Sequence, residues 1–139
     1  MKGQLKSLGV NSADYTPETY QPEEVDCFGV WINLCIGPEK QAGGHDYQVL
    51  VCTPEWLAKN RWVPGLMRHT LLVRKYDLDE IKKTITDYIE ECEGEDWMEI
   101  AKKLSRVFAW EYEDYQPYKG YAKFRPPRRD FFFASQLFR

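Results

Sequence analysis

The sequence predicts a single α+β domain, in which an antiparallel sheet carries two C-terminal helices on one face. Three observations lead to this class. Segments of alternating apolar residues come first along the chain, segments with apolar residues three and four apart come last, and a short connection joins the two clearest strands. Strands followed by helices, without regular alternation, are typical of this class. A chain of 139 residues fits one domain with one core.

The strands are predicted from their period of two. An extended segment is expected within residues 2–8, before a polar loop that contains Pro17 and Pro22. The clearest strand, CFGVWINLCIG, places five apolar side chains on one face: Phe28, Val30, Ile32, Leu34 and Ile36. The segment DYQVLVC alternates in the same way. The connection PEKQAGG between them favours antiparallel pairing, and its two glycines precede a strand, so they predict a chain reversal and not a phosphate loop.

Capping signals place the helices. Thr53 before Pro54 predicts a short helix over residues 54–59, and a third strand is expected in HTLLVRKY, residues 69–76. Asp77 with Glu80, and Asp96 with Glu99, have the spacing of capping boxes. Two apolar stripes follow these caps: Leu78, Ile81, Ile85, Tyr88, Ile89 and Cys92 in the first, and Trp97, Ile100, Ala101, Leu104, Val107 and Phe108 in the second.

Charge divides the chain into a predicted acidic domain, residues 1–118, and a basic tail, residues 119–139. The first part holds 13 Lys/Arg against 21 Asp/Glu, and the second holds 6 basic residues against one acid. An acidic body attracts basic partners and disfavours nucleic acid. No apolar run approaches the roughly 18 residues of a membrane span, and MKGQLKSLG lacks the apolar core of a secretory signal, so a cytoplasmic location without membrane contact is expected.

The residues predict neither an enzyme nor a cofactor or metal site. The cysteines at 27, 35, 52 and 92 form no close pair with one another or with the histidines at 45 and 69, as a zinc site usually requires. Cys52 ends an apolar strand, where packing is a better interpretation than a nucleophile with His45 as its base. Without an export signal, free buried thiols are expected rather than disulfides.

Two segments are candidates for binding. In AWEYEDYQPY, aromatic residues alternate with acids, which is typical of an interface for a basic protein surface; an equally good interpretation is that the aromatic residues pack on the sheet while the acids face water. The partner-binding candidates are Trp110, Glu111, Tyr112, Glu113 and Asp114.

The tail interleaves basic residues with aromatics, which suits single-stranded nucleic acid or a return onto the acidic body of the chain. The residues concerned are Lys119, Tyr121, Lys123, Phe124, Arg125, Arg128 and Arg129. Binding of nucleic acid through this tail is the alternative function. The closing apolar run FFFASQLF fits both a final strand and a docking segment for a partner.

The chain also resembles the immunity protein 8 family of bacterial polymorphic-toxin systems. The resemblance covers roughly residues 1–115. The residues that carry it are Ile36-Gly37-Pro38, Gly44-x-Asp46-Tyr47-x-Val49, Val51-Cys52-Thr53-Pro54-x-Trp56-Leu57, the helix start Tyr76-Asp77, Trp97, Ile100, Leu104 and the closing Trp110-Glu111-Tyr112-x-Asp114-Tyr115. The resemblance implies a small cytoplasmic α+β protein without catalysis or cofactor. Such a protein binds and neutralises a cognate toxin domain, for example one delivered in contact-dependent growth inhibition. The basic tail departs from the family pattern.

Overall fold

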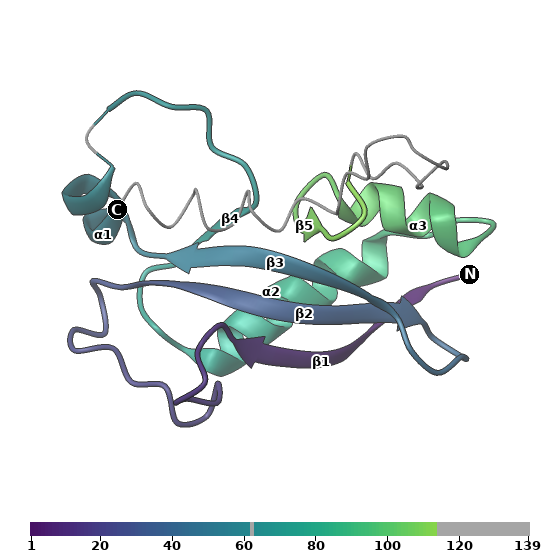
Figure 1. The fold of residues 1–139 in the computed structure, drawn as a ribbon, viewed down its shortest axis with the longest axis horizontal. Coiled ribbons are helices and arrows are strands. Elements are labelled where there is room, and N and C mark those ends of the chain that lie inside the picture. Colours follow the sequence, from purple (N-terminus) through teal and green to yellow (C-terminus); the bar gives the residue numbers. More distant parts are fainter. Residues whose placement is uncertain (62, 114–139) are drawn as a thin grey trace, which may run out of the picture.

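A mixed sheet forms the centre of the computed structural model, which describes residues 1–61 and 63–113 (Figure 1). The strands β1 (Gly3–Val10), β2 (Gly29–Pro38) and β3 (His45–Cys52) pair antiparallel in chain order. The free side of β3 is shared by two short strands. β4 (Thr70–Leu72) pairs with its last residues, and β5 (Ala109–Trp110) pairs with Tyr47 and Gln48. The predicted α+β class is confirmed.

The two short strands are where the sheet differs from the prediction. A strand was expected over residues 69–76, but the observed strand β4 is limited to Thr70–Leu72. It runs parallel to β3, whereas an antiparallel sheet was predicted. The reason is the intervening helix α1 (Pro54–Asn60), since a crossover of this kind carries the chain back to the same end of the sheet. β5 has two residues, too few to show an alternating pattern, and the sequence did not indicate it.

Glycines close the turn between β2 and β3. A Cβ atom on Gly37 would overlap the carbonyl oxygen of Gly43, and one on Gly44 would overlap that of Ile36. Gly43 itself has a φ of +82°, in the left-handed region that favours glycine. The glycine pair therefore reverses the chain, as predicted, and His45 and Asp46 already belong to the next strand.

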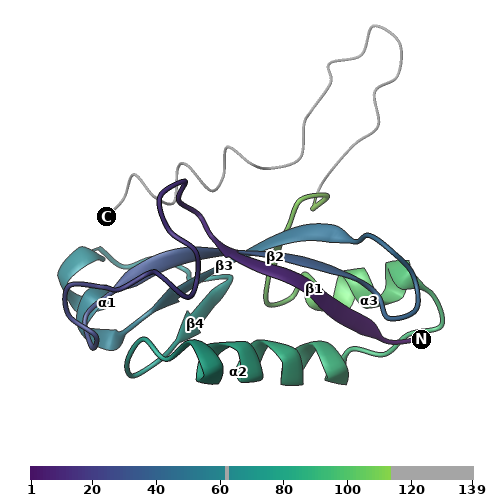
Figure 2. The ribbon, with the colours of Figure 1, turned by 90° about the horizontal axis from the view of Figure 1, so that it is seen from below.

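One face of the sheet, the inner face, is covered by α2 (Leu78–Glu91) and α3 (Trp97–Leu104); Figure 2 shows α2 running along beneath the strands. Both predicted caps are present, because the Asp77 and Asp96 side chains accept hydrogen bonds from the backbone N–H groups of Glu80 and Glu99. Both helices contribute to one core with the inner-face side chains of the sheet: Ile32, Leu34, Ile36, Tyr47, Val49, Val51, Ile81, Ile85, Ile89, Ile100, Ala101 and Leu104. The second stripe is not wholly helical, since Val107 and Phe108 lie in the turn after α3.

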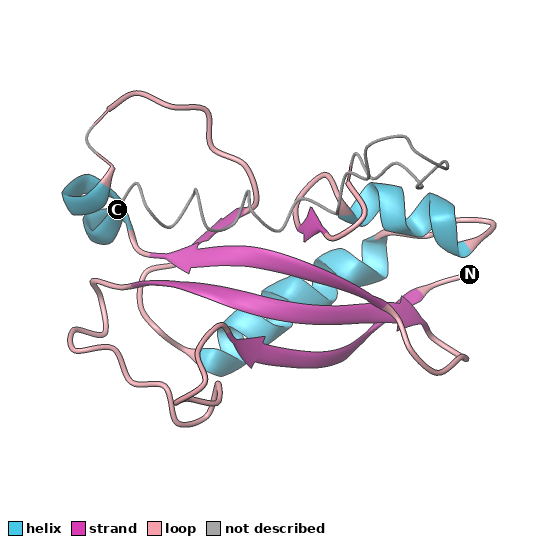
Figure 3. Ribbon diagram, viewed as in Figure 1, coloured by secondary structure: helices cyan, strands magenta, loops and turns pink. Residues whose placement is uncertain are grey.

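The opposite, outer face carries Ser7, Asn33, Cys35, Asp46 and Gln48, which the strand register places on one side. At one end, α1 closes this face: Trp56 and Leu57 pack against Trp31, Leu50 and Cys52. Figure 3 shows that the described helices leave the middle of β1 and β2 uncovered on this side. Polar side chains occupy that open part, where the Gln48 amide donates a hydrogen bond to Asn33. Among the described helices, none has the length and apolar content needed to cross a membrane.

Candidate partner-binding surface

The predicted binding segment begins inside the core. Trp110 belongs to β5, opposite Tyr47, and is only 8% exposed. Its ring is nearly parallel to that of Tyr47, with 6.4 Å between the centroids, and its indole N–H donates a hydrogen bond to Nδ1 of His45 at 3.1 Å. Trp110 therefore positions the segment, and most of its surface is not available to a partner.

His45 is the centre of a cluster that we call the indole cluster: His45, Trp97, Trp110 and Tyr112. Nδ1 of His45 accepts a second indole hydrogen bond, from Trp97 at 3.2 Å, and the Tyr112 ring packs edge-on at a centroid distance of 4.9 Å. Burial lowers the pKa of His45, against the opposing charge of Asp46. A neutral imidazole that accepts at Nδ1 carries its proton on Nε2. One histidine thus joins β3, α3 and the chain after β5.

Glu111 and Tyr112 reach the surface beside the start of β3. The Glu111 backbone N–H donates to the Asp46 carbonyl at 3.0 Å, which extends the β5 pairing by one residue and places the side chains of Glu111 and Asp46 on the outer face. Burial raises the pKa of the Cys35 thiol, and the carboxylates of Asp46 and Glu111 raise it further. Tyr112 is 39% exposed. We call Asp46, Glu111 and Tyr112 the acidic edge.

Glu113 forms an ion pair within the chain. Its carboxylate receives two hydrogen bonds from the Arg68 guanidinium, at 2.8 and 3.2 Å, and lies 3.9 Å from the imidazole of His69. Its charge is therefore balanced within the chain. Asp114 lies outside the described residues, as do the basic tail and the predicted domain boundary at residue 118.

The structure thus divides the predicted segment. Trp110 packs inward, Glu111 and Tyr112 reach the surface, and Glu113 pairs with Arg68. Asp46 is an addition that the sequence did not suggest, because only the pairing of β5 with β3 brings it beside Glu111. Likewise, the contacts of His45 with Trp97 and Trp110 span 52 and 65 residues, and local sequence patterns carry no signal for them.

The residues weighed for catalysis lie apart. His45 and Cys52 stand at opposite ends of β3. Cys52 is fully buried, and this burial raises the pKa of its thiol to about 11, so it is protonated at neutral pH. The four cysteines are free thiols.

One group of potential metal ligands occurs among the described residues: Glu24, Cys27 and Glu55, with ligand atoms within 4.8 Å of one another. Glu24 and Glu55 are exposed, and Glu55 pairs with Lys59 at 3.1 Å. The arrangement is that of a solvated ion-pair cluster. Exposed acids gathered in this way do not by themselves indicate a metal site.

Comparison with known families decides the assignment. The model of the family described as Immunity protein 8 matches residues 3–115. The chain belongs to this family. The match spans all the strands and helices described above and includes the residues of the acidic edge. No curated protein and no solved structure matches the chain. Members of an immunity protein family act against toxins and are in general not enzymes, so the natural partner class is a toxin protein.

Proposed function

We propose that this protein neutralises one cognate toxin domain of a polymorphic-toxin or contact-dependent inhibition system by binding it in the cytoplasm of the producing cell, without catalysis or cofactor. The observation that carries the proposal is the family match over residues 3–115. The packing of the candidate segment supports it, because Trp110 is fixed in the core while Glu111 is partly exposed and Tyr112 is exposed.

The proposed contact is the candidate segment of residues 110–114 together with Asp46, with Glu111 and Tyr112 at the contact and Trp110 as its support in the core. Two carboxylates and an exposed tyrosine ring lie at one corner of the sheet, and polar aromatic side chains with nearby charge are frequent at the centre of protein interfaces. A nuclease toxin has a basic substrate groove. An acidic body, with 21 Asp/Glu against 13 Lys/Arg in residues 1–118, would be drawn to such a groove. We therefore propose a nuclease as the toxin.

Co-expression tests the function directly. The toxin domain encoded by the neighbouring reading frame is expressed in a susceptible bacterium with and without this protein. Survival only in the presence of the protein is the expected result. Cell death in both cultures, with the protein present and folded, rejects the function.

A charge reversal tests the surface. Glu111→Lys should slow association with that toxin domain several-fold at low ionic strength, and the difference should shrink as salt shortens the screening length to roughly 10 Å at 0.1 M. Glu90→Lys is the matched control, because it changes the net charge equally at an exposed position on α2. Equal association rates for the two variants would remove Glu111 from the contact.

A further inference from the structure

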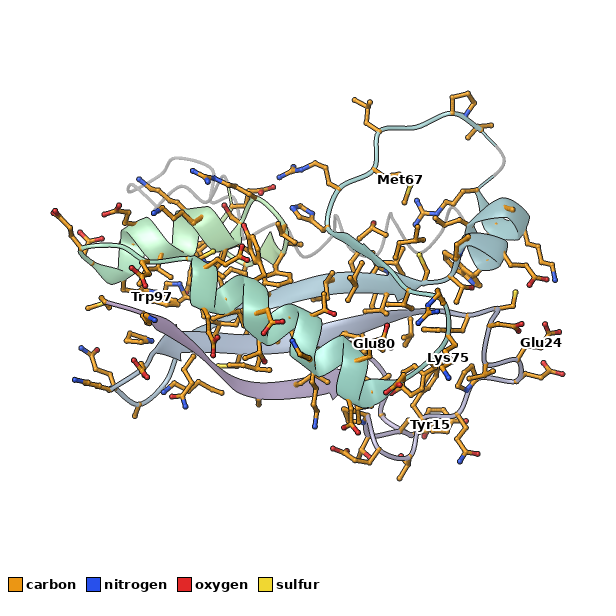
Figure 4. The ribbon with its side chains drawn as sticks, turned by 180° about the vertical axis from the view of Figure 1, so that it is seen from behind. Tyr15, Glu24, Met67, Lys75, Glu80 and Trp97 are labelled. Carbon is orange, nitrogen blue, oxygen red and sulfur yellow. The ribbon has the colours of Figure 1, made fainter. Side chains whose placement is uncertain are left out.

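The loop between α1 and β4 is a second candidate for partner binding. It precedes β4, which pairs with the C-terminal end of β3, whereas the acidic edge lies at the start of that strand. The chain between α1 and β4 stands away from the sheet, and it carries Met67, labelled in Figure 4. Val63, Leu66 and Met67 on this loop are 78%, 102% and 49% exposed. Three large apolar side chains within five residues form an exposed patch of the kind that marks interaction sites. We call residues 63–67 the apolar loop.

The loop is held at both ends. The backbone N–H of Arg61 donates to the carbonyl of Leu57 at the end of α1, and the carbonyl of His69 accepts from the N–H of Leu50 in β3. The Arg68 guanidinium is bound to Glu113, one residue beyond the acidic edge. These bonds fix the base of the loop beside the proposed contact surface, so one partner could touch both.

An open hollow of about 320 Å³ lies between this loop and α1. Its walls come from Leu57 and Ala58 of the helix and from Val63, Leu66 and Met67 of the loop, and Arg61 also lines it. Nε of Arg61 is buried and makes no hydrogen bond to any described residue. That nitrogen has no surface open to a ligand, so what Arg61 offers an occupant is its positive charge at the wall of the hollow. The hollow thus combines apolar walls with a cationic side chain.

We propose that this hollow is a second docking site for the toxin, and that it receives an apolar side chain next to a carboxylate that pairs with the charge of Arg61. This inference rests on the proposed function and adds to it a contact of different chemistry. Exposed apolar loops also insert into membranes. Membrane binding is disfavoured here, because residues 1–118 carry a net negative charge and bacterial membranes are anionic.

The test compares two methionines of equal exposure. Met67 is 49% exposed on the loop and Met98 is 48% exposed on α3. The variants are Met67→Gln, Leu66→Gln combined with Met67→Gln, and the control Met98→Gln. Each is checked for an unchanged urea unfolding midpoint, and binding of the purified toxin domain from the neighbouring reading frame is measured by calorimetry. The double variant should bind at least tenfold more weakly, and Met98→Gln should bind within twofold of the wild type.

Each result has a defined meaning. If the wild type binds the toxin domain and the double variant binds equally well, the docking site is wrong while the proposed function stands. If the folded wild type does not bind, both fall. Sedimentation with phosphatidylglycerol vesicles, lost in the double variant while toxin binding is unchanged, would assign the loop to a membrane and overturn the inference. Self-association that the double variant abolishes, again with unchanged toxin binding, would assign it to a contact between copies and overturn it equally.

Discussion

The two faces of the sheet differ in the polarity and burial of their side chains. On the inner face, Ile32, Ile36 and Val49 are completely buried under α2 and α3. On the outer face, neighbouring positions of the same strands carry Asn33, Asp46 and polar partners that remain partly exposed. Folding requires apolar side chains only where water is excluded. The polar residues of the open face are therefore the ones that a partner can use without cost to the core.

The sharpest test of this comparison replaces adjacent residues of β2. Ile32→Ala removes a fully buried inner-face side chain and should lower the free energy of unfolding by about 2–5 kcal/mol, because it leaves a cavity in the core. Asn33→Ala removes an outer-face side chain and one hydrogen bond, and should cost about 1 kcal/mol. Urea denaturation measures both. Equal losses would mean that the outer face is as important to folding as the inner face.

Two glycines, Gly29 and Gly9, distinguish the part of the outer face that α1 covers from the part that is uncovered. A Cβ atom at Gly29 would overlap the indole ring of Trp56, so Gly29→Ala should displace α1 and destabilise the protein by about 1–3 kcal/mol. At Gly9, on the uncovered part of the same face, no neighbouring atom lies within 4 Å of the place that a Cβ atom would occupy, so Gly9→Ala should leave stability unchanged or slightly raised. Thermal unfolding of the two variants compares them. A stable Gly29→Ala protein would show that α1 is loosely held.

How far the sequence predicts this arrangement depends on the range of each contact. The alternation around Ile32 and the aspartate caps at Asp77 and Asp96 are local, so the strands and both long helices could be predicted. The pairing of β5 with β3 joins residues more than 60 positions apart, and the resulting proximity of Glu111 to Asp46 follows from the tertiary fold alone. For the same reason, the pairing of Glu113 with Arg68 was not predictable, and the local pattern could not separate Glu113 from Glu111 as a candidate.

The indole cluster joins β3, α3 and β5 through His45, which accepts both indole hydrogen bonds. Substitutions of His45 therefore test what these bonds contribute to stability. His45→Leu leaves the N–H groups of Trp97 and Trp110 without an acceptor and should cost about 1–2 kcal/mol. His45→Asn places a side-chain oxygen near the position of Nδ1 and should cost less. Urea unfolding at pH 8 compares the two. Equal losses would show that packing, and not hydrogen bonding, is what His45 contributes.

The same histidine makes stability depend on pH. The pKa of His45 is lowered in the folded protein by burial, so the unfolded chain takes up a proton first as the pH falls. Its contribution is complete above the ordinary pKa of about 6.5 and is lost as the pH falls through the lower folded value. Burial also lowers the pKa of His69, which adds a loss of the same sign. The stability of His45→Asn between pH 7 and 5 should therefore change less than that of the wild type, and an identical pH dependence would assign the effect to His69.

The smallest effect is expected for the ion pair between Arg68, which follows the apolar loop, and Glu113, which follows the acidic edge. The side chain of Arg68 is 52% exposed and that of Glu113 is 21% exposed, and exposed ion pairs are worth about 0.2–1 kcal/mol. Glu113→Gln should therefore lower the free energy of unfolding by less than about 1 kcal/mol, and less still in high salt. The bidentate geometry nevertheless fixes the base of the loop relative to Glu111. If both surfaces bind one toxin domain, Glu113→Gln should weaken binding by more than it weakens folding, because the loop must then be ordered on association. A loss of affinity no greater than the loss of stability would mean that the two surfaces act independently.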